Sequence, residues 1–185
     1  INAVIQARAG STRLPGKVLE DLGGRPVLEW VIRAARAATR VDEVIVATST
    51  LVGDDAVADL ATSLGAPVVR GSEDDVLSRF VAALDAHPAD AVVRLTADCP
   101  LLDPTLIDAV VGAWTAAPTF DYVSTVLVRS LPRGMDIEPV APRAPRAVTG
   151  TAGGADRGHG PPAALAHPTA PHPSAPSRPR CCCSA

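Results

Sequence analysis

Short apolar runs alternate with patterns of helical period through residues 1–126 of this 185-residue chain. Runs that are apolar throughout are typical of strands buried on both faces, and their alternation with helices indicates a mostly parallel sheet. We therefore expect the α/β class, as a Rossmann-like three-layer α/β/α sandwich. The expected strands are residues 3–5, 43–48, 67–70, 91–95 and 122–126.

The expected helices have recognisable ends. The first begins near Pro26 and the second runs over residues 54–64, where Gly65 ends it. Ser72 and Asp75 have the spacing of a capping box for the third. The fourth follows a cap at Asp103 and runs to about residue 114. The first helix is expected to bury a stripe formed by Val27, Leu28, Val31, Ile32 and Ala35.

A cationic, glycine-containing segment, residues 6–17 (QARAGSTRLPGK), directly follows the first expected strand. It contains three cations and no acid, and its two glycines let the backbone approach a ligand closely. A polyphosphate suits this composition, although a solvated basic loop would share part of it. The residues expected to bind the anion are Ala7, Arg8, Gly10, Ser11, Thr12, Arg13 and Lys17.

Two common nucleotide motifs are excluded for this segment. A Walker A loop has four residues between its glycines and a Ser or Thr after its Lys, whereas five residues separate Gly10 from Gly16 here and Val18 follows Lys17. The dinucleotide-binding fingerprint requires three glycines at fixed spacing, which are absent.

Asp98 follows the fourth expected strand, so it lies at a carboxyl end, as the cationic segment does. In the usual strand order these two strands are neighbours, and ligands bind at that edge of the sheet. A bound triphosphate needs a divalent ion, and Mg²⁺ takes one or two carboxylates together with phosphate oxygens. Asp98 is therefore the expected ligand of Mg²⁺, the expected cofactor; the alternative is that it caps the turn before Pro100.

Charge and composition divide the chain. Its net charge of −3 argues against a nucleic-acid-binding surface, and no apolar run is long enough to span a membrane. Residues 1–138 hold 12 Lys and Arg against 19 Asp and Glu, a balance of −7. Residues 139–185 hold five Arg against one Asp, and ten of the 18 prolines. We expect one domain over 1–138 and a disordered tail over 139–185. Cys99 is the one cysteine of that domain, so no disulfide can form within it, and we expect a cytoplasmic location.

Four segments together resemble the sugar cytidylyltransferases. The run GSTRLPGK at residues 10–17 is similar to the signature loop of that family, and LTADCPL at 95–101 is similar to its metal-binding segment. Residues 70–80 resemble the family's segment near the nucleotide base, and residues 132–138 resemble the acceptor side of the spore-coat type. The resemblance is to acylneuraminate and deoxy-octulosonate cytidylyltransferases and, most closely, to spore-coat polysaccharide cytidylyltransferases.

The resemblance implies a fold of the nucleotide-diphospho-sugar transferase type and a role for each site residue. Arg13 and Lys17 would neutralise the leaving pyrophosphate, and Asp98 would anchor Mg²⁺; these three are the expected catalytic residues. Gly71 and Arg79 would contact the base or ribose, and Thr96 would help to bind the nucleotide. Asp136 or Glu138 would bind sugar hydroxyls or a second metal, although an ordinary acidic loop explains them nearly as well.

The implied function is transfer of CMP from CTP to an acidic sugar or sugar phosphate, with release of pyrophosphate, for surface or spore-coat polysaccharide synthesis. Alternatives are another nucleoside triphosphate, a polyol phosphate acceptor, or a non-catalytic nucleotide-binding remnant. The resemblance ends near residue 138, and the composition of the tail suggests a truncated or out-of-frame ending. A homodimer is expected if an intact carboxyl-terminal region were present.

Overall fold

The computed structural model describes residues 1–11, 14–117, 119–126 and 131–145. Five strands and four α-helices alternate along these residues, with a short 3-10 helix, η1, before α2. The strands are β1 (Asn2–Gln6), β2 (Glu43–Ser49), β3 (Val68–Gly71), β4 (Val92–Thr96) and β5 (Glu138–Val140). The helical elements are α1 (Val27–Ala37), η1 (Val52–Asp54), α2 (Asp55–Ser63), α3 (Val76–Ala86) and α4 (Pro104–Ala116).

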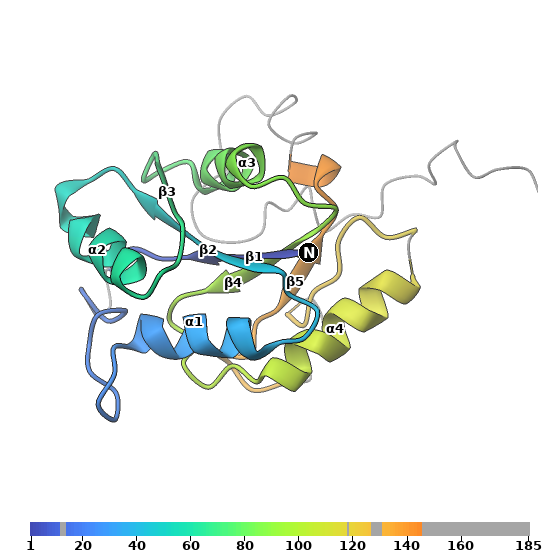
Figure 1. The fold of residues 1–185 in the computed structure, drawn as a ribbon, viewed down its shortest axis with the longest axis horizontal. Helices are drawn as coiled ribbons and strands as arrows, with labels where there is room; N and C mark the ends of the chain where they lie inside the picture. The colour runs from blue at the N-terminus through green and yellow to red at the C-terminus, as the bar shows by residue number, and fades with distance from the viewer. Residues whose placement is uncertain (12–13, 118, 127–130, 146–185) are drawn as a thin grey trace, which may run out of the picture.

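The strands form one sheet in the order β3-β2-β1-β4-β5 (Figure 1). The first four strands are parallel, and β5 runs antiparallel to β4. Gln6 at the end of β1 pairs in register with Ala47 of β2 and with Thr96 of β4. The expected mostly parallel sheet is confirmed, and the segments that follow β1 and β4 leave the sheet side by side.

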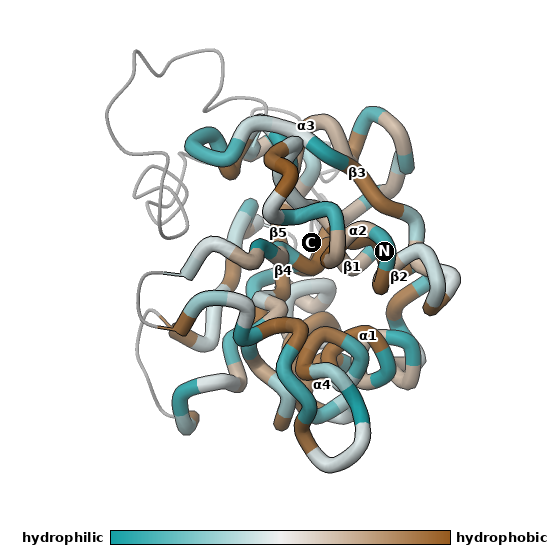
Figure 2. Tube along the Cα trace, turned by 90° about the vertical axis from the view of Figure 1, so that its left-hand side faces the viewer, coloured by the Kyte–Doolittle hydropathy of each residue, from teal (hydrophilic) through white to brown (hydrophobic). Residues whose placement is uncertain are grey.

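Helices cover both faces of the sheet, as Figures 1 and 2 show, with α3 on one side and α1 and α4 on the other. The alternation of side chains along β1 explains the two cores. Ala3 and Ile5 pack with residues of α1, α2 and α4, whereas Val4 packs with α3. Each fully buried Val, Leu or Ile side chain stabilises the fold by about 1.5–3 kcal/mol. The expected three-layer sandwich is confirmed.

Two helices begin and pack as their sequences indicate. The buried face of α1 consists of Leu28, Val31, Ile32 and Ala35, which leaves partly buried Val27 out of the predicted stripe. Asp103 caps α4, because its carboxylate accepts a hydrogen bond from the Thr105 amide at 2.7 Å.

The capping box predicted for the third helix is wrong by one turn. Ser72 accepts a hydrogen bond from the Asp75 amide at 3.2 Å, but α3 begins at Val76, and Asp75 is the residue that caps it. The Asp75 carboxylate accepts from the Ser78 amide at 2.9 Å. Two capping residues three positions apart both fit the sequence rule, and the structure uses Asp75 for the helix and Ser72 for the preceding turn.

The predicted fifth strand is also wrong: Tyr122 forms an isolated bridge with Val140, and the fifth strand is β5. The Tyr122 segment still lies alongside β5, since the Val123 amide donates to the carbonyl of Pro139 at 3.1 Å. Proline cannot donate to a ladder, so a run centred on Pro139 did not suggest a strand. Because β5 is short and lies at the end of the sheet, it tolerates this proline.

The domain boundary predicted at residue 138 falls inside β5. Val140 and Ala144 are buried with Tyr122, so the folded part reaches residue 145. Residues 146–185 lie outside the described residues, and their predicted disorder stays a prediction. Among the described helices, none combines the length and apolar character required to cross a bilayer.

Candidate functional site

The cationic segment begins where β1 ends, and neighbouring strands hold its first residues. The Ala7 amide donates to the carbonyl of Ala47 at 3.0 Å, and the Ala97 amide donates to the carbonyl of Gln6 at 3.0 Å. Ala7 is 1 % exposed, so its side chain belongs to the core. These contacts fix the start of the segment beside the residues that precede Asp98.

Ala9 closes the loop that follows. Its carbonyl accepts hydrogen bonds from the amides of Ser11 and Gly16, at 2.9 and 2.8 Å. Gly16 has φ of 73°, a left-handed conformation that favours glycine. Thr12 and Arg13 lie outside the described residues, so their expected roles stay predictions. Ala9, Ser11 and Gly16 thus form a compact turn.

Lys17 lies just beyond this turn, and its ammonium donates a hydrogen bond to the Asp98 carboxylate. Its neighbour Val18 is 2 % exposed and anchors the backbone in the core. The two side chains of the ion pair are 27 % and 39 % exposed, so ligands can reach both. The expectation that the loop cation and the acid after β4 share one edge of the sheet is confirmed, while their catalytic roles stay predictions.

The charge of Asp98 depends on its surroundings. Partial burial favours the neutral acid, but hydrogen bonds and the charge of Lys17 outweigh it and hold the pKa of Asp98 below its ordinary value. The Thr96 hydroxyl also contributes, and it lies 2.9 Å from the Cys99 sulfur. Burial raises the pKa of the Cys99 thiol, as do the charges of Asp98 and Asp136. Thr96 therefore helps to keep Asp98 ionised, and Asp136 lies close to Cys99, the residue after Asp98.

Arg79 and Gly71 interact with each other. Arg79 is 1 % exposed and donates hydrogen bonds to the carbonyls of Ser72 and Glu73, the latter at 2.9 Å. A Cβ atom added at Gly71 would lie 2.9 Å from Arg79 Cγ, which explains why glycine is found there. The structure thus gives both residues a role in shaping the β3–α3 loop; their predicted contact with the base or ribose stays untested.

The same loop approaches the cationic segment through Glu73. Its carboxylate oxygen Oε1 lies 4.0 Å from Arg8 Nη1 and 3.2 Å from the position of a Cβ added at Gly10. Burial lowers the pKa of Arg79, and the charge of Arg8 lowers it further, whereas nearby carboxylates, that of Glu73 included, oppose the shift. The β3–α3 loop thus lies next to residues 8–10, and the acidic side chain of Glu73 meets the basic side chain of Arg8 there.

Asp54 is a residue of this edge that the sequence reading did not single out. It is 3 % exposed, and its carboxylate accepts hydrogen bonds from Ser49 at the end of β2 and from the Ala9 amide at 2.6 Å. An aspartate before a helix usually caps that helix, so the sequence offered no reason to connect it with residues 8–10. The signal that could have found it is its position after β2, a neighbour of β1.

Glu138 takes part in a buried network. Its side chain is 3 % exposed and accepts a hydrogen bond from Arg94 at 2.6 Å, and Arg94 also donates to the Gln6 side chain at 3.1 Å. Burial raises the pKa of the neighbouring Tyr122 to about 12, as does the charge of Glu138. This network links β1, β4 and β5, so Glu138 has a structural partner, and its predicted binding of sugar hydroxyls or a second metal stays a prediction.

The donor set suits a magnesium ion held mainly by phosphate oxygens. Over residues 1–11, 14–117, 119–126 and 131–145, no group of three or more His, Cys, Asp or Glu side chains could hold a metal by itself. Mg²⁺ at nucleotide sites typically uses one or two carboxylates and completes its shell with phosphates and water. The partly exposed carboxylate of Asp98 meets that requirement.

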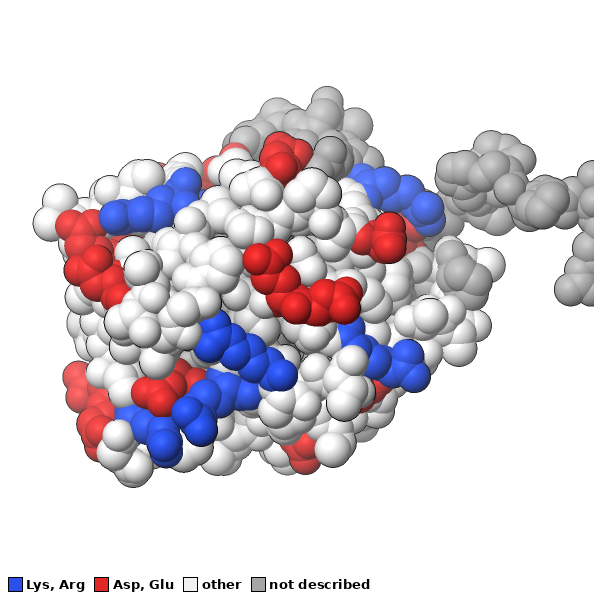
Figure 3. All heavy atoms as spheres, viewed as in Figure 1, with Lys and Arg blue, Asp and Glu red and all other residues white. Residues whose placement is uncertain are grey.

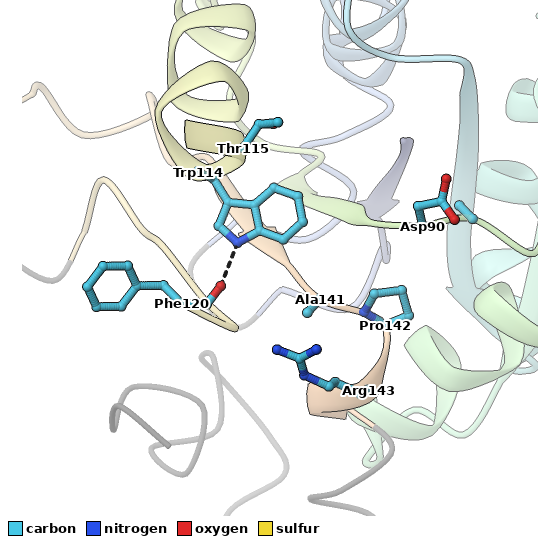
Figure 4. A pocket seen from close by; sticks show the side chains of 8 residues that line it. Asp90, Trp114, Thr115, Phe120, Ala141, Pro142 and Arg143 are labelled. Atoms are coloured by element: carbon cyan, nitrogen blue, oxygen red, sulfur yellow. Dashed lines mark hydrogen bonds between the residues drawn. The ribbon is translucent and has the colours of Figure 1, made fainter. Parts of the chain in front are cut away.

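A cavity of about 520 Å³ lies away from this edge. Trp114, Phe120 and Arg143 line it together with Asp90, which precedes β4, whereas Asp98 follows β4 (Figure 4). The Trp114 indole donates to the carbonyl of Phe120 at 3.0 Å. None of the predicted site residues lines this cavity, so it is separate from the candidate site.

Acidic and basic side chains are interspersed over the face shown in Figure 3.

Comparison with known proteins agrees with this arrangement. Residues 2–131 match the family model described as cytidylyltransferase. Over 114 residues the chain is 40 % identical to the spore coat polysaccharide biosynthesis protein SpsF of Bacillus subtilis, covering 60 % of this chain and 48 % of that protein. Over 123 residues it is 36 % identical to a 3-deoxy-manno-octulosonate cytidylyltransferase of Trichlorobacter lovleyi, covering 64 % and 46 %.

A solved structure extends the match to the fold. A cytidylyltransferase from Leptospira borgpetersenii superposes with a TM-score of 0.78 at 31 % identity, covering 82 % of this chain and 64 % of that one. The chain spans about half the length of the curated relatives it matches. The matched residues contain β1 to β4, the cationic segment and Asp98. The chain belongs to the cytidylyltransferase family.

Proposed function

We propose that this chain transfers CMP from CTP to a sugar, either an acidic sugar or a sugar phosphate, and releases pyrophosphate. The observation that carries the proposal is the ion pair between Lys17 and Asp98 beside the loop closed by Ala9. It brings a cation for phosphate oxygens and a carboxylate for Mg²⁺ to the same edge of the sheet. Family membership and the names of the relatives support CTP and a sugar acceptor.

In the proposed reaction a sugar oxygen attacks the α-phosphorus of CTP while the bond from that phosphorus to the bridging oxygen of pyrophosphate breaks. A proton of an attacking hydroxyl leaves to solvent, and the electron pair of the broken bond stays on pyrophosphate. Lys17 and Arg13 neutralise the charge that develops on the leaving group. Such catalysis consists mainly of positioning and electrostatic stabilisation.

Asp98 would hold Mg²⁺, which would supply electrostatic stabilisation of the charge on the phosphates. The Asp98 carboxylate is held ionised by Lys17 and by the Thr96 hydroxyl, so it is ready to accept a cation at neutral pH. Lys17 can then turn from Asp98 to the phosphates, because both side chains are partly exposed. The amides near Gly10, together with Arg8, would contact the β- and γ-phosphates.

The sugar is assigned by class. The relatives act in spore-coat polysaccharide synthesis and on 3-deoxy-manno-octulosonate, as their names state, so we propose surface-polysaccharide synthesis as the setting and the cytoplasm as the place. The homodimer expected for a chain with an intact carboxyl-terminal region stays a prediction.

Pyrophosphate release by the full 185-residue chain tests the proposal. The assay combines CTP, UTP, ATP or GTP with Mg²⁺ and a panel containing 3-deoxy-manno-octulosonate, other acidic sugars, sugar phosphates and polyol phosphates. We expect release with CTP and an acidic sugar or a sugar phosphate. Release with another nucleotide or with a polyol phosphate would favour a nucleotidyltransferase of different substrate specificity. Nucleotide binding without release would favour a non-catalytic remnant.

A further inference from the structure

Asp54 occupies a helix-capping position without capping the helix. It is the residue immediately before α2, and its side chain makes no hydrogen bond to the first amides of that helix. Aspartate at this position usually accepts such a bond, which stabilises the helix. The carboxylate of Asp54 instead accepts hydrogen bonds from Ala9 and Ser49, and the residue is 3 % exposed.

Three donors from two strand ends surround this buried carboxylate. The Ala9 amide donates at 2.6 Å, the Ser49 amide donates at 3.2 Å, and the Ser49 hydroxyl donates as well. A buried carboxylate without donors is strongly destabilising, and here three donors satisfy its oxygens. Asp54 therefore ties the end of β2 to the segment that follows β1.

Ala9 is the residue on which the loop closes. Its amide is held by Asp54, and its carbonyl accepts from the amides of Ser11 and Gly16. Both peptide groups of Ala9 are therefore fixed, one by the β2–α2 connection and one by the loop itself. A shift at Ala9 would move Gly10 and Ser11 with it, and misplacement by about 1 Å is enough to cost about 100-fold in rate at a reacting centre.

We propose that Asp54 is a positioning residue for Ala9, Gly10 and Ser11, the described start of the polyphosphate-binding loop. The inference rests on the proposed function, because it assumes that this loop binds the phosphates of the nucleotide. Asp54 touches no phosphate; it sets the orientation of the Ala9 peptide, and through that peptide the amides of the loop. An aspartate suits the task because one carboxylate accepts from both strand ends at once.

Asp55 provides a matched control. It is the next residue along the chain, its side chain is 50 % exposed, and its carboxylate pairs with Arg70 at 2.7 Å. Asp54→Asn and Asp55→Asn therefore make the same chemical change one residue apart. The Ala9 and Ser49 amides donate to different oxygens of the Asp54 carboxylate, and asparagine replaces one of those oxygens with an NH₂ donor. Ser49→Ala is a milder variant, because it withdraws one donor and leaves the carboxylate in place.

The experiment measures two quantities on the full chain and its variants. The first is the hydrogen-exchange rate of the Ala9 amide, which reports the contact without any substrate. The second is the affinity for inorganic tripolyphosphate by calorimetry. For Asp54→Asn we expect Ala9 exchange to accelerate about tenfold and affinity to fall about tenfold, the size of effect that loss of one charged hydrogen bond produces. Ser49→Ala should lose roughly threefold in affinity, and Asp55→Asn should match the wild type.

The outcomes separate this inference from the function on which it rests. If the wild-type chain binds tripolyphosphate and Asp54→Asn and Ser49→Ala bind it equally well, the positioning role is contradicted and the proposed function stands. If Ala9 exchange is unchanged in Asp54→Asn, the structural link itself is contradicted. A wild-type chain that does not bind tripolyphosphate contradicts the proposed function, and this inference with it.

Discussion

Lys17 and Asp98 are 81 residues apart in the chain and form an ion pair at the carboxyl ends of β1 and β4. The pairing of these two parallel strands, with Gln6 in register with Thr96, brings the two side chains together. The charges that the proposed chemistry needs are thus placed by the order of strands in the sheet.

Lys17→Ala should abolish most of the turnover and leave the fold intact. Removing a single group that stabilises charge in a transition state typically lowers kcat by about 10²–10³. The ion pair is partly exposed, so its loss should change the free energy of unfolding by about 0–1 kcal/mol. Pyrophosphate release and thermal unfolding measure the two effects. Arg33→Ala, which removes an exposed cation of α1 paired with Glu29, serves as the control; a near-normal rate in Lys17→Ala would refute the role.

The titration of Asp98 should respond to the same substitution. In the wild type the pKa of Asp98 is lowered although burial opposes the shift, since Lys17 provides much of the lowering. A carboxyl with a lowered folded pKa stabilises the fold above its unfolded pKa, and this contribution is lost as pH falls through the folded pKa. Because Lys17→Ala removes the hydrogen bond and the charge that lower it, the pKa of Asp98 should rise in this variant. Titration of the Asp98 carboxyl carbon by NMR measures it, and an unchanged or lower pKa would contradict the electrostatic account.

Gly71→Ala should destabilise the protein, because the new methyl group would lie 2.9 Å from Arg79 Cγ. Overpacking of this kind costs about 1–3 kcal/mol. Gly53→Ala is the matched control, since a Cβ atom there meets nothing within 4 Å and the backbone is outside the left-handed region. Chemical denaturation of the two variants should show a lower midpoint for Gly71→Ala alone. Equal stability of the two would mean that the Arg79 packing is not restrictive.

Glu138→Gln should lower stability through the Arg94 side chain. Arg94 is 15 % exposed and would lose a charged partner at 2.6 Å. Breaking one side of a buried ion pair costs about 3–5 kcal/mol, and a retained neutral acceptor should reduce that loss. The denaturation midpoint should fall, whereas the Mg²⁺ dependence of nucleotide binding should stay the same. A change in the metal titration with unaltered stability would instead favour the metal-binding role predicted from the sequence.

The sequence predicted the sheet well because buried parallel strands have a strong local signature. The runs that became β1, β2 and β4 are mainly apolar, and the capping aspartate of α4 has its proline beside it. The position of β5 could not be read in the same way. Pro139 weakens its local preference for a strand, and tertiary contacts with β4 and the Tyr122 segment determine the outcome.

In the candidate site, too, the residues with a local sequence signal could be predicted and those that depend on distant contacts could not. Lys17 and Asp98 could be predicted because charge, glycines and strand ends all occur in short segments. The burial of Arg79 and the direction of the Asp54 side chain could not, because each depends on contacts with a distant segment. For Arg79 the sequence suggested a ligand contact, which stays a prediction, and the fold adds hydrogen bonds from Arg79 to the carbonyls of Ser72 and Glu73.

Calorimetric titration of CTP into the full chain, with and without Mg²⁺, tests the central claim most directly when it is repeated on Asp98→Asn. We expect Mg²⁺ to strengthen CTP binding to the wild type and to have little effect on the variant, because the carboxylate that holds the ion is gone. The same Mg²⁺ dependence in both proteins would contradict the account and leave Asp98 as a turn-capping residue.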